Sequence, residues 1–199
     1  MLKKELRKVY LAKRKALAID QIMQASEKIT NHFFESFDLR LQEVKYVHLF
    51  LSILQKGEVN TQPIIERIWK DYPHIQLIIP KVDFDEDILL HYLYNPDTEI
   101  TVNHWGIPEP NNSKQIAENQ IDMVLMPLVC VDESGFRVGY GKGHYDKFLA
   151  KCKSDIQKIG LSFFEPIEKI TDTNHFDIPL DACVFGENCT SKVIFFEKV

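Results

Sequence analysis

Apolar residues recur along the chain in two patterns, one with helical spacing and one of short unbroken runs. Within residues 2–17, the apolar positions fall on one arc of a helix, as expected for an amphipathic helix with one buried face. These positions are Leu2, Leu6, Val9, Tyr10 and Leu17. A second segment with the same spacing extends to Phe37, and we expect the Asp20 side chain to cap its first turn.

The unbroken runs have the length of strands, and helical segments separate several of them. One predicted helix follows Asn60 or Thr61, with Pro63 in its first turn, and another covers 144–153. The predicted strands are 44–51, 75–80, 88–94, 121–131, 158–164, 181–186 and 192–196. The run 121–131 is apolar throughout, which is typical of a strand buried on both faces. The alternation predicts an α/β fold, a single domain over residues 1–199 with three layers and a central, mostly parallel sheet.

Composition and charge narrow the possible partners. Of 199 residues, 45% are hydrophobic and 27% are charged, which is ordinary for a soluble protein with a core. The formal net charge of −5 argues against general nucleic-acid binding, which depends on a basic surface. No apolar run approaches the roughly 18 residues that span a bilayer, and the basic N-terminus lacks the apolar segment of a secretory signal. We therefore expect a cytoplasmic monomer that binds neither nucleic acid nor membranes.

The four cysteines form no CxxC pair, and we expect them to be reduced and partly buried. They are Cys130, Cys152, Cys183 and Cys189. The spacing of His175, Cys183 and Cys189 fits no common zinc pattern.

Glycine is concentrated in the segment RVGYGKGHYDKFL, Arg137–Leu149, between a predicted buried strand and a predicted helix. Three of the eight glycines, Gly139, Gly141 and Gly143, fall within five residues. Such a loop lets backbone N–H groups converge on a phosphate, and Lys142 and Arg137 add positive charge. The spacing GxGxG matches neither the Rossmann fingerprint nor the Walker A motif. From spacing alone, a turn without a ligand is an equal alternative.

Basic residues also gather at the N-terminus, where Lys3, Arg7 and Arg14 fall on one stripe of the first predicted helix. A solvated face and an anion-binding face fit this stripe equally well. Asp146 follows the glycines in the first turn of the next helix. It either complements the helix dipole or shares a divalent cation with a bound phosphate, because Mg²⁺ is typically held by carboxylates together with phosphate oxygens.

The sequence GFRVGYGKGHYDKFL closely resembles the signature of the 5-formyltetrahydrofolate cyclo-ligase family, also called methenyltetrahydrofolate synthetases. The resemblance covers nearly the whole chain, through KKELRK, LFLSILQKGEVNT, WGIPEP, MPLVCVD and FDIPLDACV. It implies an α/β fold similar to sugar-phosphate isomerases and CoA-transferases. It also implies the ATP- and Mg²⁺-dependent cyclisation of 5-formyltetrahydrofolate to 5,10-methenyltetrahydrofolate, with release of ADP and phosphate.

The resemblance also assigns roles to residues. It implies ATP binding by Lys3, Arg7, Arg137, Val138, Gly139, Tyr140, Gly141, Lys142, Gly143, His144 and Tyr145, with Arg137 and Lys142 as catalytic cations. It implies Mg²⁺ binding by Asp146 and Asp177. It implies substrate contacts by Leu51, Glu58, Tyr140 and His144. Trp105 is a further candidate, because its ring could stack on a flat substrate ring, and a core or loop anchor fits it equally well. Tyrosine is frequent in the family at the position of His144, and some members carry arginine at that of Tyr140.

Two other functional classes suit the same residues. A phosphosugar isomerase or CoA-transferase on a related fold uses a glycine-rich anion site without magnesium or a pterin pocket. A non-catalytic nucleotide-binding module binds its ligand without turnover. ATP consumption distinguishes the folate enzyme from both.

Overall fold

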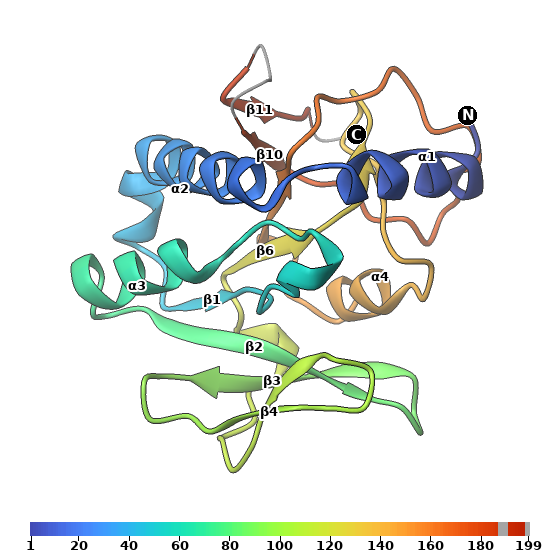
Figure 1. Ribbon diagram of the computed structural model, residues 1–199. Helices are drawn as coiled ribbons and strands as arrows, with labels where there is room; N and C mark the ends of the chain where they lie inside the picture. Colours follow the sequence, from blue (N-terminus) through green and yellow to red (C-terminus); the bar gives the residue numbers. More distant parts are fainter. Residues whose placement is uncertain (187–190, 198–199) are drawn as a thin grey trace.

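A seven-stranded sheet forms the centre of the computed structural model, which describes residues 1–186 and 191–197 (Figure 1). The strand order is β11-β10-β9-β6-β1-β2-β3. The strands are β1 (Tyr46–His48), β2 (Gln76–Asp83), β3 (Ile88–Tyr94), β6 (Met123–Pro127), β9 (Gln157–Ser162), β10 (Ala182–Phe185) and β11 (Val193–Phe195). The five central strands are parallel, and β3 and β11 pair antiparallel at the edges. The predicted mostly parallel sheet is confirmed.

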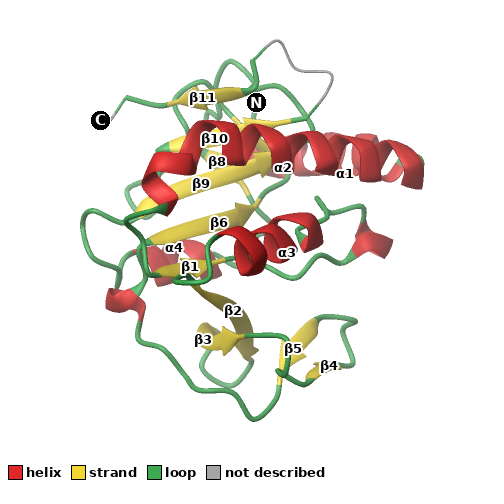
Figure 2. Cartoon of the chain, turned by 90° about the vertical axis from the view of Figure 1, so that its left-hand side faces the viewer, coloured by secondary structure: helices red, strands yellow, loops and turns green. Residues whose placement is uncertain are grey.

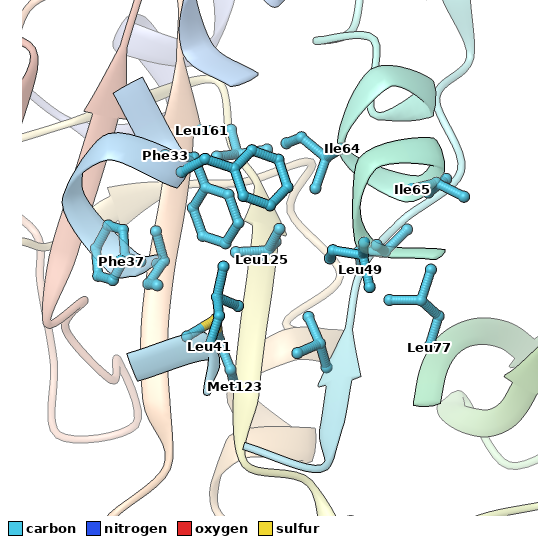
Figure 3. Packing of buried hydrophobic residues seen from close by; sticks show 14 of the residues in the cluster. Phe33, Phe37, Leu41, Leu49, Ile64, Ile65, Leu77, Met123, Leu125 and Leu161 are labelled. Carbon is cyan, nitrogen blue, oxygen red and sulfur yellow. The ribbon is translucent and has the colours of Figure 1, made fainter. Parts of the chain in front are cut away.

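Helices cover both faces of this sheet (Figure 2). The α-helices of the described residues are α1 (Lys3–Lys15), α2 (Ile19–Leu41), α3 (Gln62–Asp71) and α4 (His144–Leu149), and the last three cover the faces. Helices α2 and α3 pack on one face, where Phe33 and Ile64 meet Leu125 of β6 in the core that Figure 3 shows. On the other face, Phe148 of α4 packs with Val124 of β6. Successive β6 side chains therefore enter opposite cores, which explains why its sequence is apolar without alternation.

Strand β6 is shorter than predicted, because the apolar run 121–131 contains two separate strands, β6 and the start of a hairpin. Strand β6 ends at Pro127, and the chain then forms a hairpin of β7 (Cys130–Val131) and β8 (Arg137–Val138). The Val129 N–H donates to the Val138 carbonyl at 2.7 Å. Gly135 in the hairpin has a φ of 82°, a conformation that favours glycine. The hairpin carries the glycine-rich loop past the carboxyl end of β6.

Several other boundaries differ from expectation. Helix α2 begins at Ile19, so Asp20 lies within its first turn and the prediction of an Asp20 cap is wrong. The Gln21 side chain instead accepts the N–H of Ala18 at 2.9 Å. Helix α4 ends at Leu149, and β1 covers only part of 44–51. The predicted loop 104–110 is partly strand, since β5 (Pro108–Pro110) pairs with β4 (Ile100–Val102).

The first helix lies at the carboxyl edge of the sheet, and the arrows of β6 and β9 point toward it in Figure 2. Its buried Leu6 packs with Val129, Cys130 and Val138, which fixes α1 against the β7–β8 hairpin. The sheet order reverses between β1 and β6, and ligands of open α/β sheets bind at such a switch point.

Among the described residues, Cys130, Cys152 and Cys183 form no disulfide, as predicted, whereas Cys189 lies outside the described residues. Burial raises the pKa of the Cys130 and Cys152 thiols to about 12, so few thiolates exist at neutral pH. Across residues 1–186 and 191–197, no helix has the length and apolar character needed to span a membrane.

Candidate active site

The glycine-rich loop is shaped by left-handed backbone conformations and closed by a cation from α1. Gly141 has a φ of 100° and Gly143 a φ of 70°, and Gly143 precedes the first residue of α4. Arg7 Nε donates to the Gly139 carbonyl at 2.7 Å. A Cβ at Gly141 would lie 3.4 Å from the Arg7 guanidinium carbon, so glycine lets the two approach closely. The basic stripe of α1 thus faces the loop rather than only solvent.

The two carboxylates predicted to bind metal lie on adjacent segments, and each is paired with a predicted phosphate-binding cation. Lys3 Nζ contacts the Asp177 carboxylate oxygens at 2.5 and 2.6 Å. Arg137 Nη2 contacts Asp146 Oδ1 at 2.7 Å. The same Asp146 oxygen accepts the Ile178 N–H at 3.1 Å, and the Ile178 carbonyl accepts Arg137 Nη1 at 2.5 Å. The structure therefore brings Lys3, Arg137, Asp146 and Asp177 into one charged cluster.

This cluster has the donor atoms that Mg²⁺ prefers but too few of them for a metal site made by protein alone. Asp146 and Asp177 supply hard carboxylate oxygens. In the part of the chain that the structure describes, no three His, Cys, Asp or Glu side chains converge to hold a metal ion. A magnesium site here needs further oxygens, and Mg²⁺ commonly takes them from nucleotide phosphates and water. The residues present fit a metal that arrives with a phosphate ligand.

A second cluster joins the glycine-rich loop to the turn after β1. Tyr140 OH donates to Glu58 Oε1 and accepts from Arg14 Nη2, the latter at 2.8 Å. Glu58 Oε2 accepts the Ile53 N–H at 2.8 Å, and Glu58 is only 6% exposed. Burial and the Glu58 carboxylate raise the pKa of Tyr140, so its hydroxyl keeps the proton that it donates. The predicted substrate residues Glu58 and Tyr140 are thus in direct contact, and Arg14, which sequence spacing placed on the basic stripe, is the third member.

Other predicted residues lie around these clusters. Lys142 is exposed and has no ion-pair or hydrogen-bond partner within the described ranges. Val138 is fully buried beneath the loop, and Leu51 packs at the margin of the core under α2 and α3. Trp105 is 59% exposed, in the turn between β4 and β5, and its ring neighbours are His104 and Phe84. It makes no described contact with the glycine-rich loop.

His144 has a contact that the sequence did not indicate. Its Nε2 lies 2.9 Å from Asp87 Oδ1 in the β2–β3 turn, and Lys147 Nζ lies 2.7 Å from the other oxygen. Hydrogen bonds from Lys147 and then His144 lower the pKa of Asp87 to about 2. The two α4 residues therefore tie the start of α4 to the neighbouring hairpin.

Behind the loop lies a buried polar cluster that sequence reasoning missed. His48 and His91 are 0% and 2% exposed, with ring centroids 5.1 Å apart, and Phe148 stacks 4.1 Å from His91. Neither imidazole, nor the buried Tyr145 hydroxyl, has a hydrogen-bond partner in the described structure. Burial lowers the pKa of His91 to about 4 and the pKa of His48 well below its usual value. In the sequence, the only indication of this cluster was that two predicted strands, otherwise apolar, each contain a histidine.

These histidines should make folding stability fall on acidification. Their folded-state pKa values lie below the unfolded value of about 6.5, so below that pH the unfolded chain binds more protons. For His91 the loss begins near pH 6.5 and continues to about pH 4, with a limiting slope of about 1.4 kcal/mol per pH unit. Urea unfolding at several pH values measures the free energy of unfolding. Between about pH 4 and pH 6.5, this free energy should fall less steeply with decreasing pH in His91→Leu than in the unsubstituted protein. The control His175→Gln, at an exposed position, should leave the pH dependence of the unfolding free energy unchanged. An unaltered pH dependence in His91→Leu would contradict the contribution of the buried His91 to acid sensitivity.

Comparisons with a family model, with curated relatives and with solved structures all point to the same family. The model of the 5-formyltetrahydrofolate cyclo-ligase family matches residues 1–186. A 5-formyltetrahydrofolate cyclo-ligase of Haemophilus influenzae is 30% identical over 186 residues, which cover 92% of this chain and 94% of that protein. The solved structure of the Aquifex aeolicus 5,10-methenyltetrahydrofolate synthetase aligns with a TM-score of 0.77 at 32% identity, covering 94% of this chain and 91% of that one. The solved structure of a 5,10-methenyltetrahydrofolate synthetase from Mycoplasma pneumoniae aligns with a TM-score of 0.72 at 26% identity, covering 91% of this chain and 96% of that one.

Proposed function

Because the chain belongs to the 5-formyltetrahydrofolate cyclo-ligase family, we propose that it converts 5-formyltetrahydrofolate to 5,10-methenyltetrahydrofolate at the expense of ATP, with Mg²⁺. The observation that carries this proposal is the position of Tyr140. This residue of the glycine-rich loop directly contacts Glu58 in the turn after β1. A phosphate-binding loop and a buried carboxylate suited to the N–H groups of a reduced pterin are therefore neighbours.

The proposed chemistry accounts for this combination of groups. The formamide oxygen on N5 is a poor leaving group, so ring closure by N10 requires its activation. The formyl oxygen attacks the γ-phosphorus of ATP, and the bond from this phosphorus to the bridging oxygen of ADP breaks. N10 then attacks the formyl carbon and loses its proton, and inorganic phosphate leaves with the former formyl oxygen. Phosphoryl transfer of this kind depends mostly on positioning and charge neutralisation.

The cations of the site are suited to the phosphates. Lys142, exposed in the loop, is free to reach the transferred phosphoryl group, while Arg7 and the loop N–H groups hold the remaining phosphates. Lys3 and Arg137 are paired with Asp177 and Asp146 in the structure. On nucleotide binding, these cations would exchange carboxylate for phosphate oxygens, and Asp146 and Asp177 would then be free to hold Mg²⁺, which would further neutralise the phosphate charge.

Substrate binding requires that the hydrogen bond from Tyr140 to Glu58 be replaced by hydrogen bonds from the substrate. The cavity beside Glu58 has a volume of only about 10 Å³, so a pterin enters only when side chains move. Tyr140 is 44% exposed and lies in a glycine-rich segment, so its hydroxyl is the group best placed to withdraw. The pterin N–H groups then replace Tyr140 OH as donors to Glu58.

Omission assays test the proposed reaction. Purified protein is mixed with 5-formyltetrahydrofolate and Mg·ATP, and the near-ultraviolet band of the methenyl product is followed. We expect product only when ATP and a divalent cation are both present, and none when EDTA replaces the cation. Product formed equally well without ATP would overturn the proposal.

A further inference from the structure

The glycine-rich loop, residues 139–143, is held at both ends by side chains from other segments. Three of its five residues are glycine, so its backbone loses more freedom on ordering than that of most loops. At its first end, Arg7 Nε donates to the Gly139 carbonyl at 2.7 Å. At its second end, Gly143 leads into α4, whose first residue, His144, contacts the turn between β2 and β3. No residue of this turn takes part in the proposed chemistry.

The second anchor is the Asp87 carboxylate, which two side chains of α4 share. His144 Nε2 lies 2.9 Å from one carboxylate oxygen, and Lys147 Nζ lies 2.7 Å from the other. Lys147 Nζ also donates to the Asp87 carbonyl at 3.0 Å. Because His144 and Lys147 are three residues apart, they lie on one face of α4 and reach the same group. A helix of six residues has little stability of its own, so these contacts help to fix where it begins.

The turn that carries Asp87 is a firm support. One oxygen of the Asp83 carboxylate accepts the N–H groups of Asp85 and Glu86 at 3.0 and 3.1 Å. Strands β2 and β3 pair along their length up to Asp83 and Ile88. Asp87 itself has a φ of 50°, a left-handed conformation that aspartate tolerates better than most residues. A carboxylate on such a turn holds the start of α4 in place rather than following it.

Another contact of α4 is expected to open when nucleotide binds. Asp146 Oδ1 lies 2.7 Å from Arg137 Nη2 in the structure, and the proposed exchange would give these groups to Mg²⁺ and phosphate. With 3.6 residues per turn, Asp146 lies roughly 100–160° around the helix from Lys147 and His144. The contacts with Asp87 are therefore on a different face of α4, and they can persist while the phosphate side rearranges.

We propose that Asp87 is a positioning residue for nucleotide binding, which holds the second end of the glycine-rich loop in the conformation that receives the phosphates. The inference rests on the proposed function, because it takes residues 139–143 to bind phosphates. Asp87 acts through His144 and Lys147, whereas its own negative charge repels phosphates. The anchoring effect and the charge effect of Asp87 on nucleotide binding therefore have opposite signs.

Replacing Asp87 with glycine removes the carboxylate and suits a φ of 50°. The Kd for Mg·ADP, measured by isothermal titration, should rise about three- to tenfold, as expected for the loss of two exposed ion pairs. KM for Mg·ATP should rise by a similar factor, while kcat and the Kd for 5-formyltetrahydrofolate stay nearly unchanged. Asp87→Asn keeps one acceptor oxygen and the tolerance for a positive φ, so its effect should be smaller in the same direction.

The matched control is Asp85→Gly, in the same turn. The Asp85 side chain is exposed, and its carboxylate has no partner in the described structure. By charge alone, the loss of either acid should strengthen the binding of a polyanion slightly. Asp85→Gly should therefore leave the Kd for Mg·ADP unchanged or lower it. Lys147→Met should weaken binding in the unsubstituted protein, and by a smaller factor in the Asp87→Gly background, because the two residues act through one contact.

Unchanged or tighter Mg·ADP binding in Asp87→Gly would overturn the positioning role, and so would equal weakening in Asp85→Gly. Fully additive effects of Asp87→Gly and Lys147→Met would also overturn it, because the two side chains would then act independently. Weaker Mg·ADP binding confined to Asp87→Gly, with the unsubstituted protein forming no methenyl product, would retain the positioning role and overturn the proposed reaction instead.

Discussion

Replacing Lys142 with methionine is expected to lower turnover by about a hundred- to thousandfold, the usual effect of losing one group that stabilises transition-state charge. The side chain is exposed and has no partner in the described structure, so it is free to follow the phosphoryl group during transfer. For the same reason, its loss should leave the melting temperature nearly unchanged. Steady-state assays and a thermal melt of the same preparation provide both values.

The control for this change is Lys114→Met, which removes an exposed lysine far along the chain from the glycine-rich loop. It should match the unsubstituted protein in both measurements. Full turnover in Lys142→Met would show that this lysine is only a solvated loop residue. A fall in activity that merely parallels a fall in melting temperature would equally contradict a direct role.

Replacing Glu58 with glutamine should weaken binding of 5-formyltetrahydrofolate by about 1–3 kcal/mol, through the loss of charge-assisted hydrogen bonds to the pterin. Affinity for ATP should barely change, because the described contacts of Glu58 are to Tyr140 and the Ile53 N–H, and not to the Lys3, Arg7 and Arg137 cations proposed for ATP. Isothermal titration with each ligand measures the two effects separately. The change also removes a buried charge, so a melting curve must show that the variant is folded at the titration temperature.

The chain offers a matched control in Glu109, which like Glu58 is 6% exposed. It accepts a hydrogen bond from Asn103 Nδ2 at 2.9 Å within the β4–β5 hairpin. Glu109→Gln removes a similarly buried charge, yet we expect no effect on folate binding. A loss confined to ATP in Glu58→Gln, or equal losses of folate affinity in both variants, would contradict the role of Glu58.

Local patterns were enough to predict much of the fold. The unbroken apolar run at 121–131 located β6, and the strand–loop–helix order placed the glycine-rich loop at the carboxyl edge. The break after Pro127 was not predictable, because β7 is as apolar as β6, and what separates them is the pairing with β8. The Asp20 cap failed because α2 begins at Ile19, before Asp20, and the N-cap position falls on Ala18.

The site was predictable as far as residue types, but the pairing of those residues was not. Spacing placed Lys3, Arg7 and Arg14 on one stripe, yet their different partners depend on how α1 packs on the hairpin. The contact of Tyr140 with Glu58 joins residues 82 positions apart, so no local pattern contains it. The buried His48–His91 pair was missed for a related reason, since β1 and β3 lie on either side of β2 and meet only in the folded sheet.

The fate of the formyl oxygen tests the central claim most directly. 5-Formyltetrahydrofolate labelled with oxygen-18 in the formyl group is incubated with the protein, unlabelled Mg·ATP and ordinary water, and the released phosphate is analysed by mass spectrometry. Phosphoryl transfer to the formyl oxygen predicts that each phosphate formed with methenyl product carries one labelled oxygen. Unlabelled phosphate, formed together with methenyl product, would show that ATP does not activate this oxygen and would contradict the proposed mechanism.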